Sequence, residues 1–282
     1  MKKTILIISI ILILVGASLV LVKQSNFFST QKDQESVTVT ATPTPTPTPT
    51  DVTTQDDSLI TAIPIVEEDF AYNQGVLTYA DSEVGIDVSG FQGDIDWEKV
   101  KQDGIDFAII RVGYRGATVG NIAEDKYFEQ NISGAIDAGI KVGVYFYSQA
   151  ITAQEAIEEA NYVLEKISDY DLTYPVFFDW EYTNYAESRV TEITSEDVTT
   201  FANEFLNVIA DAGYITGVYI NDDQMEDFYD LGVLASPYKW YAYYDGIPSL
   251  ECEFDLLQHS CTGTVNGIDS DVDLNISFVI FD

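Results

Sequence analysis

The sequence alternates short apolar runs with longer amphipathic stretches, and this alternation constrains the fold more than any other feature. The apolar runs are rich in β-branched and aromatic residues and are bounded by Gly or Asp, which is typical of buried strands. Five such runs lie at 84–89, 107–113, 141–148, 174–181 and 215–220. The stretches between them predict helices at 96–103, 123–138, 152–167 and 194–212. The repeating unit is therefore a strand followed by a helix.

Local signals mark the ends of these helices. Thr152 with Glu155, and Thr194 with Asp197, have the spacing of capping boxes. Gly139 and Gly213 stand where helix C-caps are expected. After residue 220 the pattern changes to three strand-like runs with short connections, at 239–244, 254–260 and 271–279. Five strand–helix units followed by three strands predict an α/β fold, an irregular TIM-like (β/α)5β3 barrel.

The N-terminal segments have a different character. Residues 1–23 place Lys2 and Lys3 before an uncharged apolar run that is about long enough to cross a bilayer, which predicts a signal anchor or a signal peptide. Because no convincing cleavage site follows, an uncleaved membrane helix is favoured. Residues 24–63 are Thr-rich with four consecutive Thr-Pro pairs, typical of a disordered linker. We expect residues 64–282 to form one extracytoplasmic domain, membrane-anchored or secreted.

Composition excludes several classes of function. With 13 Lys and Arg against 47 Asp and Glu, the net charge of −34 argues against nucleic acid as a partner. His259 is the only histidine, and Cys261 lies two positions along the same predicted strand, so a thiol peptidase and a zinc amidase are both disfavoured. Cys252 and Cys261 could form a disulfide, but their spacing does not decide it. We expect no cofactor and no metal, and a monomer.

The apolar run at 174–181 ends in two carboxylates, Asp179 and Glu181. Because side chains alternate along a strand, both would project to the same side of its C-terminal end. Crowded carboxyls in a partly apolar site have pKa values that move apart, which suits one acid and one ionised partner in glycosidic bond cleavage. Asp87 lies near the end of the first strand, and Asp273 with Asp271 lies on the last. In a barrel of this kind, catalytic residues gather at one rim; we expect Asp271 to be at the surface.

Six segments of the predicted barrel form an ordered set of motifs. They are residues 84–97, 107–114, 143–148, 175–181, 239–244 and 257–275, which include Gly85-Ile86-Asp87-Val88-Ser89 and Phe178-Asp179-Trp180-Glu181. In this order they resemble glycoside hydrolase family 25, the Chalaropsis-type lysozymes, over about residues 84–282. Leu257-Gln258-His259 departs from the Trp-Gln-Tyr that is frequent in that family.

The resemblance implies an N-acetylmuramidase that cleaves the β-1,4 bond between N-acetylmuramic acid and N-acetylglucosamine in peptidoglycan glycan strands. Glu181 matches the general acid, and Asp179, Asp87 and Asp273 match the other acidic positions. We expect Phe178 and Trp180 to help keep Glu181 protonated, and Asp179 to be ionised. Two carboxylates of one strand approach a sugar from nearly the same side, which favours attack by the substrate's acetamido group, oriented by Asp179, over a side-chain nucleophile.

Aromatic and amide side chains at the predicted strand ends are candidates for sugar binding: Tyr114, Tyr147, Trp240, Tyr244 and Gln258. Packing in the core or at the rim is an equally good interpretation of the aromatic rings. Two other functions remain open on the sequence alone. One is a non-catalytic wall-binding module on the same barrel, and the other is a chitinase-like glycosidase.

Overall fold

The computed structural model describes residues 60–73, 75–184, 186–221, 228–234, 238–250 and 253–282. They all belong to one compact unit of the chain, residues 50–282. The expected signal segment 1–23, most of the expected linker 24–63, and Cys252 lie outside the described residues. Within the described part, no helix has the length and apolar character needed to cross a membrane.

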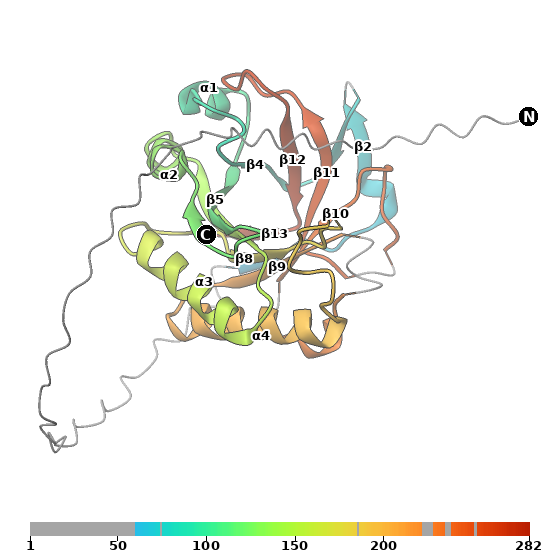
Figure 1. Ribbon diagram of the computed structural model, residues 1–282. Coiled ribbons are helices and arrows are strands. Elements are labelled where there is room, and N and C mark those ends of the chain that lie inside the picture. Colours follow the sequence, from blue (N-terminus) through green and yellow to red (C-terminus); the bar gives the residue numbers. More distant parts are fainter. Residues whose placement is uncertain (1–59, 74, 185, 222–227, 235–237, 251–252) are drawn as a thin grey trace, which may run out of the picture. The chain divides into compact units, whose positions relative to one another are not determined.

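Eight strands close into a ring (Figure 1). From β4 to β11 each strand is parallel to its neighbour, whereas β12 runs antiparallel to both β11 and β4 and closes the ring. The predicted α/β fold with an eight-stranded barrel is therefore confirmed. The strands of the ring are β4 (Glu83–Val88), β5 (Phe107–Arg115), β7 (Lys141–Ser148), β8 (Val176–Trp180), β9 (Thr216–Asn221), β10 (Tyr238–Ala242), β11 (Leu256–Gly263) and β12 (Val272–Ser277).

Four α-helices of the described chain connect the first five strands of the ring: α1 (Trp97–Gln102), α2 (Phe128–Asp137), α3 (Ala153–Ile167) and α4 (Ser195–Asp211). The capping box at α4 is complete, because the side chain of Thr194 accepts from the Asp197 N–H and the Asp197 carboxylate accepts from the Thr194 N–H. At α3, Thr152 accepts from the Glu155 N–H, but the Glu155 carboxylate accepts from the Ile151 N–H instead. The connection from β9 to β10 contains the 3-10 helix η3 (Leu231–Val233). Its residues 222–227 and 235–237 are not among those that the structure describes.

Alternation along the strands separates two apolar layers. One face packs under the helices, as where Phe178 contacts Phe205 of α4. The other fills the barrel interior with rings such as Phe177 and Trp240, whose centroids lie 5.2 Å apart. Glycine at position 217 leaves room for the Phe177 ring, as a Cβ there would overlap it. The interior below the rim is thus a packed aromatic core.

Five short strands and one boundary differ from the expectations. Residues 122–124 form β6 (Ile122–Glu124), antiparallel to β5, so α2 begins at Phe128, five residues later than predicted. A three-residue strand shows no helical or strand periodicity that could reveal it. Four further strands form two antiparallel pairs. The strand β1 (Ile60–Ala62) pairs with β13 (Val279–Phe281), and β2 (Phe70–Asn73), which follows η2 (Glu67–Asp69), pairs with β3 (Val76–Tyr79). The described fold therefore begins before the expected boundary at residue 64.

The interior packing predicts the effect of a methyl group at position 217. Gly217→Ala should lower the free energy of unfolding by about 1–3 kcal/mol, because the Phe177 ring that it meets is held against Trp240. Gly116→Ala is the matched control, since its nearest contact would be the Asn121 carbonyl oxygen at 3.7 Å. Denaturant unfolding measures both. Equal stability of the two variants would contradict the described interior.

Candidate active site

The residues Asp179 and Glu181 lie at the C-terminal end of β8. Phe177 on the same strand belongs to the barrel interior, and the alternation places Asp179 on that side of the sheet, with Glu181 directly after the strand. Asp179 is 6% exposed, and Glu181 is half-buried at the mouth. The backbone after β8 is held by buried Gln149, whose Nε2 donates to the Glu181 carbonyl at 2.7 Å. The expected juxtaposition of the two carboxyls is present.

Asp87 and Asp273 join this pair at the same rim. Asp87 lies near the end of β4, and Asp273 lies near the start of β12. Because β12 is antiparallel to β4, its beginning meets the end of β4, and the two residues are direct partners in the ladder. The N-terminal end of β12 therefore places the Asp273 carboxyl at the same rim as the C-terminal ends of the parallel strands.

A chain of hydrogen bonds fixes the Asp87 carboxylate. Its Oδ2 accepts from Gln258 Nε2 at 2.7 Å and from Asn275 Nδ2 at 2.9 Å. Asn275 Oδ1 accepts from the buried Trp240 indole at 2.8 Å. Gln258 Oε1 accepts from the hydroxyls of Tyr219 at 3.1 Å and Tyr244 at 2.6 Å. Every amide therefore has its orientation determined, and the carboxylate cannot turn without breaking several bonds.

Burial raises the pKa of all four carboxyls. The pKa of Asp87 rises to about 6, since its hydrogen bonds only partly offset desolvation. Burial and the charge of Asp87 raise the pKa of Asp273 to about 8. Burial and the charge of Asp273 raise the pKa of Glu181 to about 6. The free site therefore holds protons that isolated carboxyls would have lost at neutral pH.

Asp179 has the most unfavourable surroundings for a negative charge. Burial first, and then repulsion from Glu181 and Asp87, raise its pKa well above the ordinary value, against the opposing effect of Arg111. Its Oδ1 atom is buried without a hydrogen-bond partner in the described structure. The sequence predicted Asp179 to be the ionised member of the pair. In the free site, burial and the neighbouring carboxyls oppose this ionisation.

Arg111 is a site residue that the sequence analysis missed. It comes from β5, its Nε and Nη2 atoms contact Asp125 Oδ2 at 2.8 and 2.7 Å, and its guanidinium lies over the rings of Phe91 and Tyr114. It supplies the positive charge that acts on Asp179. A cation within an apolar strand was the signal that could have revealed it, since such a charge must have a partner.

The candidate sugar-binding residues divide into two groups. Tyr114 and Tyr244 are 38% and 50% exposed, and half-buried Tyr147 is the ladder partner of both Asp179 and Tyr114. Their rings stand at the rim, where a ligand could contact them. Trp240 and Gln258 are 1% and 4% exposed and are engaged in the hydrogen bonds that lead to Asp87. Trp240 therefore offers no ring face to a sugar, and both residues position the site from below.

Two expectations about the surroundings of Glu181 need correction. Phe178 and Trp180 face the helix layer, where Phe178 packs on Phe205 and the Trp180 indole donates to the Ala150 carbonyl. They alternate with Glu181 along the strand and so lie on the other side of the sheet. Burial of the Glu181 carboxyl, and then the charge of Asp273, raise the pKa of Glu181 instead. Asp271 is exposed, as expected.

The sole histidine and its neighbouring cysteine do not form a nucleophilic pair. Half-buried His259 lines a pocket beside the rim, and exposed Cys261 has a pKa raised mainly by burial, which is opposite to an activated thiol. Within the described residues no group of His, Cys, Asp and Glu is arranged to hold a metal ion. The site can therefore exchange protons through its carboxyls, with Arg111 as its cation.

Comparisons with known proteins agree with this geometry. The sequence profile described as glycosyl hydrolases family 25 matches residues 86–268. An autolytic lysozyme of Clostridium acetobutylicum is 30% identical over 193 residues, 68% of this chain and 54% of the relative. Lysozyme M1 of Streptomyces globisporus is 28% identical over 207 residues, 68% of this chain and 66% of the relative. The chain thus matches about half to two thirds of these relatives' lengths.

A solved structure has the same fold. The family 25 glycosyl hydrolase from Bacillus anthracis superimposes with a TM-score of 0.60 at 21% identity, covering 77% of this chain and 93% of that one. At this identity the likeness concerns the fold alone. The sequence profile, by contrast, matches most of the barrel, from β4 to the segment before β12. On this match, the chain belongs to glycosyl hydrolases family 25.

Proposed function

We propose that this protein is a peptidoglycan hydrolase, a lysozyme of the N-acetylmuramidase type that cleaves the β-1,4 bond between N-acetylmuramic acid and N-acetylglucosamine. One observation carries the proposal: Asp179 and Glu181 stand together at the barrel rim, and burial raises the pKa of both. Two carboxyls with shifted pKa values are what glycosidic cleavage requires. Family membership and relatives named as lysozymes support the same conclusion.

Glu181 is the proton donor to the leaving oxygen in this proposal. It is the more accessible member of the pair, at the mouth of the barrel, whereas Asp179 lies deeper with one oxygen fully enclosed. A general acid must reach the substrate atom that it protonates. Its pKa of about 6 lets it carry a proton in mildly acidic conditions and release it during turnover.

Asp179 orients the acetamido group of the substrate, which attacks the anomeric carbon. The buried Oδ1 of Asp179 has no partner in the free site, and the amide N–H of an acetamido group is a donor that would fill this position. A hydrogen bond to the charged form favours ionisation, and Arg111 acts in the same direction. Substrate binding would thus favour transfer of the Asp179 proton to Glu181, whose pKa rises beside the newly ionised Asp179. The two carboxyls then have the protonation that the reaction needs.

The other site residues support this pair. Asp87 and Asp273 adjust the charge at the rim, Gln258 and Trp240 hold Asp87 in place, and sugar rings pack on Tyr114, Tyr147 and Tyr244. The barrel would act outside the cytoplasm on the cell wall, as a monomer without a cofactor. Anchoring by residues 1–23 on a linker of residues 24–63 remains part of the proposal.

The acid assignment predicts the behaviour of Glu181→Gln. Loss of the transferable proton should lower kcat about 10²–10⁴-fold, while the variant still binds purified cell walls. Release of reducing ends from peptidoglycan, with mass spectrometry of the products, measures the rate and identifies the bond. Ends that terminate in N-acetylglucosamine in place of N-acetylmuramic acid would contradict the muramidase assignment.

Controls separate catalysis from folding. Glu98→Gln, at an exposed position of α1, should retain parental activity. A carboxyl with a raised folded pKa stabilises the protein fully below its ordinary pKa, and this contribution is lost as pH rises through about 6. Glu181→Gln should therefore unfold at pH 8 at a temperature no lower than the parent. A variant that lyses walls as fast as the parent would refute the role of Glu181.

The pKa of Glu181 also predicts the pH dependence of the reaction. Since a general acid must be protonated in the complex, kcat on soluble glycan strands should fall on an alkaline limb as pH rises. This limb should lie above pH 6, because ionised Asp179 raises the pKa of Glu181 in the complex. Steady-state rates from about pH 4 to 9 measure it. A kcat that does not fall between about pH 6 and 9 would be inconsistent with this mechanism.

A further inference from the structure

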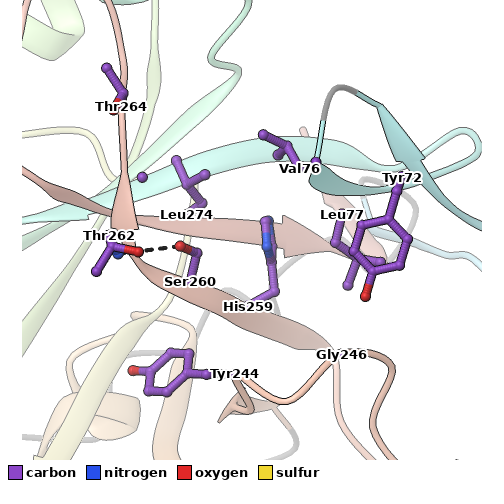
Figure 2. Close-up of a pocket in the computed structure, with 12 residues that line it drawn as sticks. Tyr72, Val76, Leu77, Tyr244, Gly246, His259, Ser260, Thr262, Thr264 and Leu274 are labelled. Carbon is purple, nitrogen blue, oxygen red and sulfur yellow. Dashed lines mark hydrogen bonds between the residues drawn. The ribbon is translucent and has the colours of Figure 1, made fainter.

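A pocket lies beside the carboxyl cluster, between the β2–β3 hairpin and β11 (Figure 2). It encloses about 420 Å³, within the range of small-molecule sites. Tyr244 belongs to both places, since its ring lines the pocket and its hydroxyl donates to Gln258, which in turn donates to Asp87. A ligand in the pocket would therefore touch a side chain that is two hydrogen bonds from Asp87 of the carboxyl cluster.

The hairpin gives the pocket a fixed wall. Phe70 and Tyr79, ladder partners at its base, pack on Phe278 with ring centroids 5.9 and 4.9 Å away. Tyr72 and Leu77, the partners one step further on the same face, line the pocket. Because the base is anchored in the core, the upper half is held over the barrel. The hairpin precedes residues 86–268, so it lies outside the region that the family profile matches.

The chemistry of the pocket differs from that of the rest of the chain. Among the described residues that line it, none is Asp, Glu, Lys or Arg, although the chain has a net charge of −34. Its polar groups are hydroxyls and one imidazole, and burial lowers the pKa of His259 to about 4, so that it is neutral above that pH. The residues that provide these groups are Tyr72, Tyr244, His259, Ser260, Thr262 and Thr264.

Two aromatic rings are presented to a ligand. Tyr72 is 60% exposed and Tyr244 is 50% exposed, and in Figure 2 they lie on different sides of His259. Exposed rings beside several hydroxyls and without charges suit a pyranose, which has apolar faces and a neutral polar edge. The charged peptides of peptidoglycan would instead require ionic partners, which this lining lacks.

We propose that the hairpin pocket is an accessory glycan subsite, which binds an uncharged N-acetylglucosamine unit of the strand beyond the cleaved bond. This inference rests on the proposed function, since it takes the ligand of the neighbouring carboxyl cluster to be a glycan. A strand that crosses Tyr244 occupies both places at once. The subsite therefore makes long strands better substrates than short ones.

The test uses the full chain and glycan strands of defined length, a tetrasaccharide and an octasaccharide or longer. Tyr72→Ala should raise KM for the long strands about 3- to 10-fold, the value of a lost aromatic contact, with kcat unchanged. KM for the tetrasaccharide should stay at the parental value. Tyr72→Phe, which keeps the ring, should retain most of the binding. Thr78→Ala is the matched control, because Thr78 is on the same hairpin and does not line the pocket.

Binding to catalytically inactive protein separates this inference from the proposed function. In a Glu181→Gln background, calorimetry should show weaker binding of the long strand when Tyr72→Ala is added, and unchanged binding with Thr78→Ala. If Glu181→Gln binds the long strand equally well with and without Tyr72→Ala, the subsite is refuted, whether or not the parent hydrolyses glycan. If the parent cleaves no glycan but Tyr72→Ala still weakens binding, the subsite stands and the hydrolase proposal falls.

Discussion

The crowding of four carboxyls at one end of a closed barrel is the constraint on which the account depends. Asp87, Asp179, Glu181 and Asp273 share a space in which burial raises every pKa, and Arg111 is the cation that opposes this at Asp179. Ionising all four together would place like charges in a poorly solvated mouth, so the site retains protons. The fold thus raises the proton affinity of these carboxyls before any ligand binds.

The alternation of side chains along each strand explains both the packed barrel interior and the carboxyls at its rim. On β8, Phe177 fills the interior against Trp240, while one step further along the same face Asp179 reaches the rim. On β12, Asn275 lies below and Asp273 above, so the indole of Trp240 supports Asp87 through the intervening amide. Aromatic packing below therefore determines where the carboxyls above can be. A shift of the strand register by one residue would remove both at once.

Sequence patterns predicted what is local and periodic. The strands of the ring, the capping box at Thr194 and the shared face of Asp179 and Glu181 follow from spacing along the chain. Features that depend on distant pairing were not predictable in this way, among them the β1–β13 pair and the Tyr72 hairpin. The depth of a side chain was not predictable from the sequence either. Trp240 and Tyr244 both stand near strand ends, but Trp240 is buried and Tyr244 is exposed. Burial opposes the ionisation of Asp179, and the sequence did not show how deep this side chain lies.

The central claim is that burial at the rim keeps these carboxyls protonated beyond their ordinary range. Carbon-13 NMR titration of the side-chain carboxyls tests it directly, in the parent and in Glu181→Gln. We predict a glutamate signal that titrates near pH 6 in the parent and is missing from the variant, and an aspartate signal, that of Asp273, that titrates near pH 8. If every carboxyl instead titrates at the ordinary value of about 4, the rim is solvated and the account is wrong.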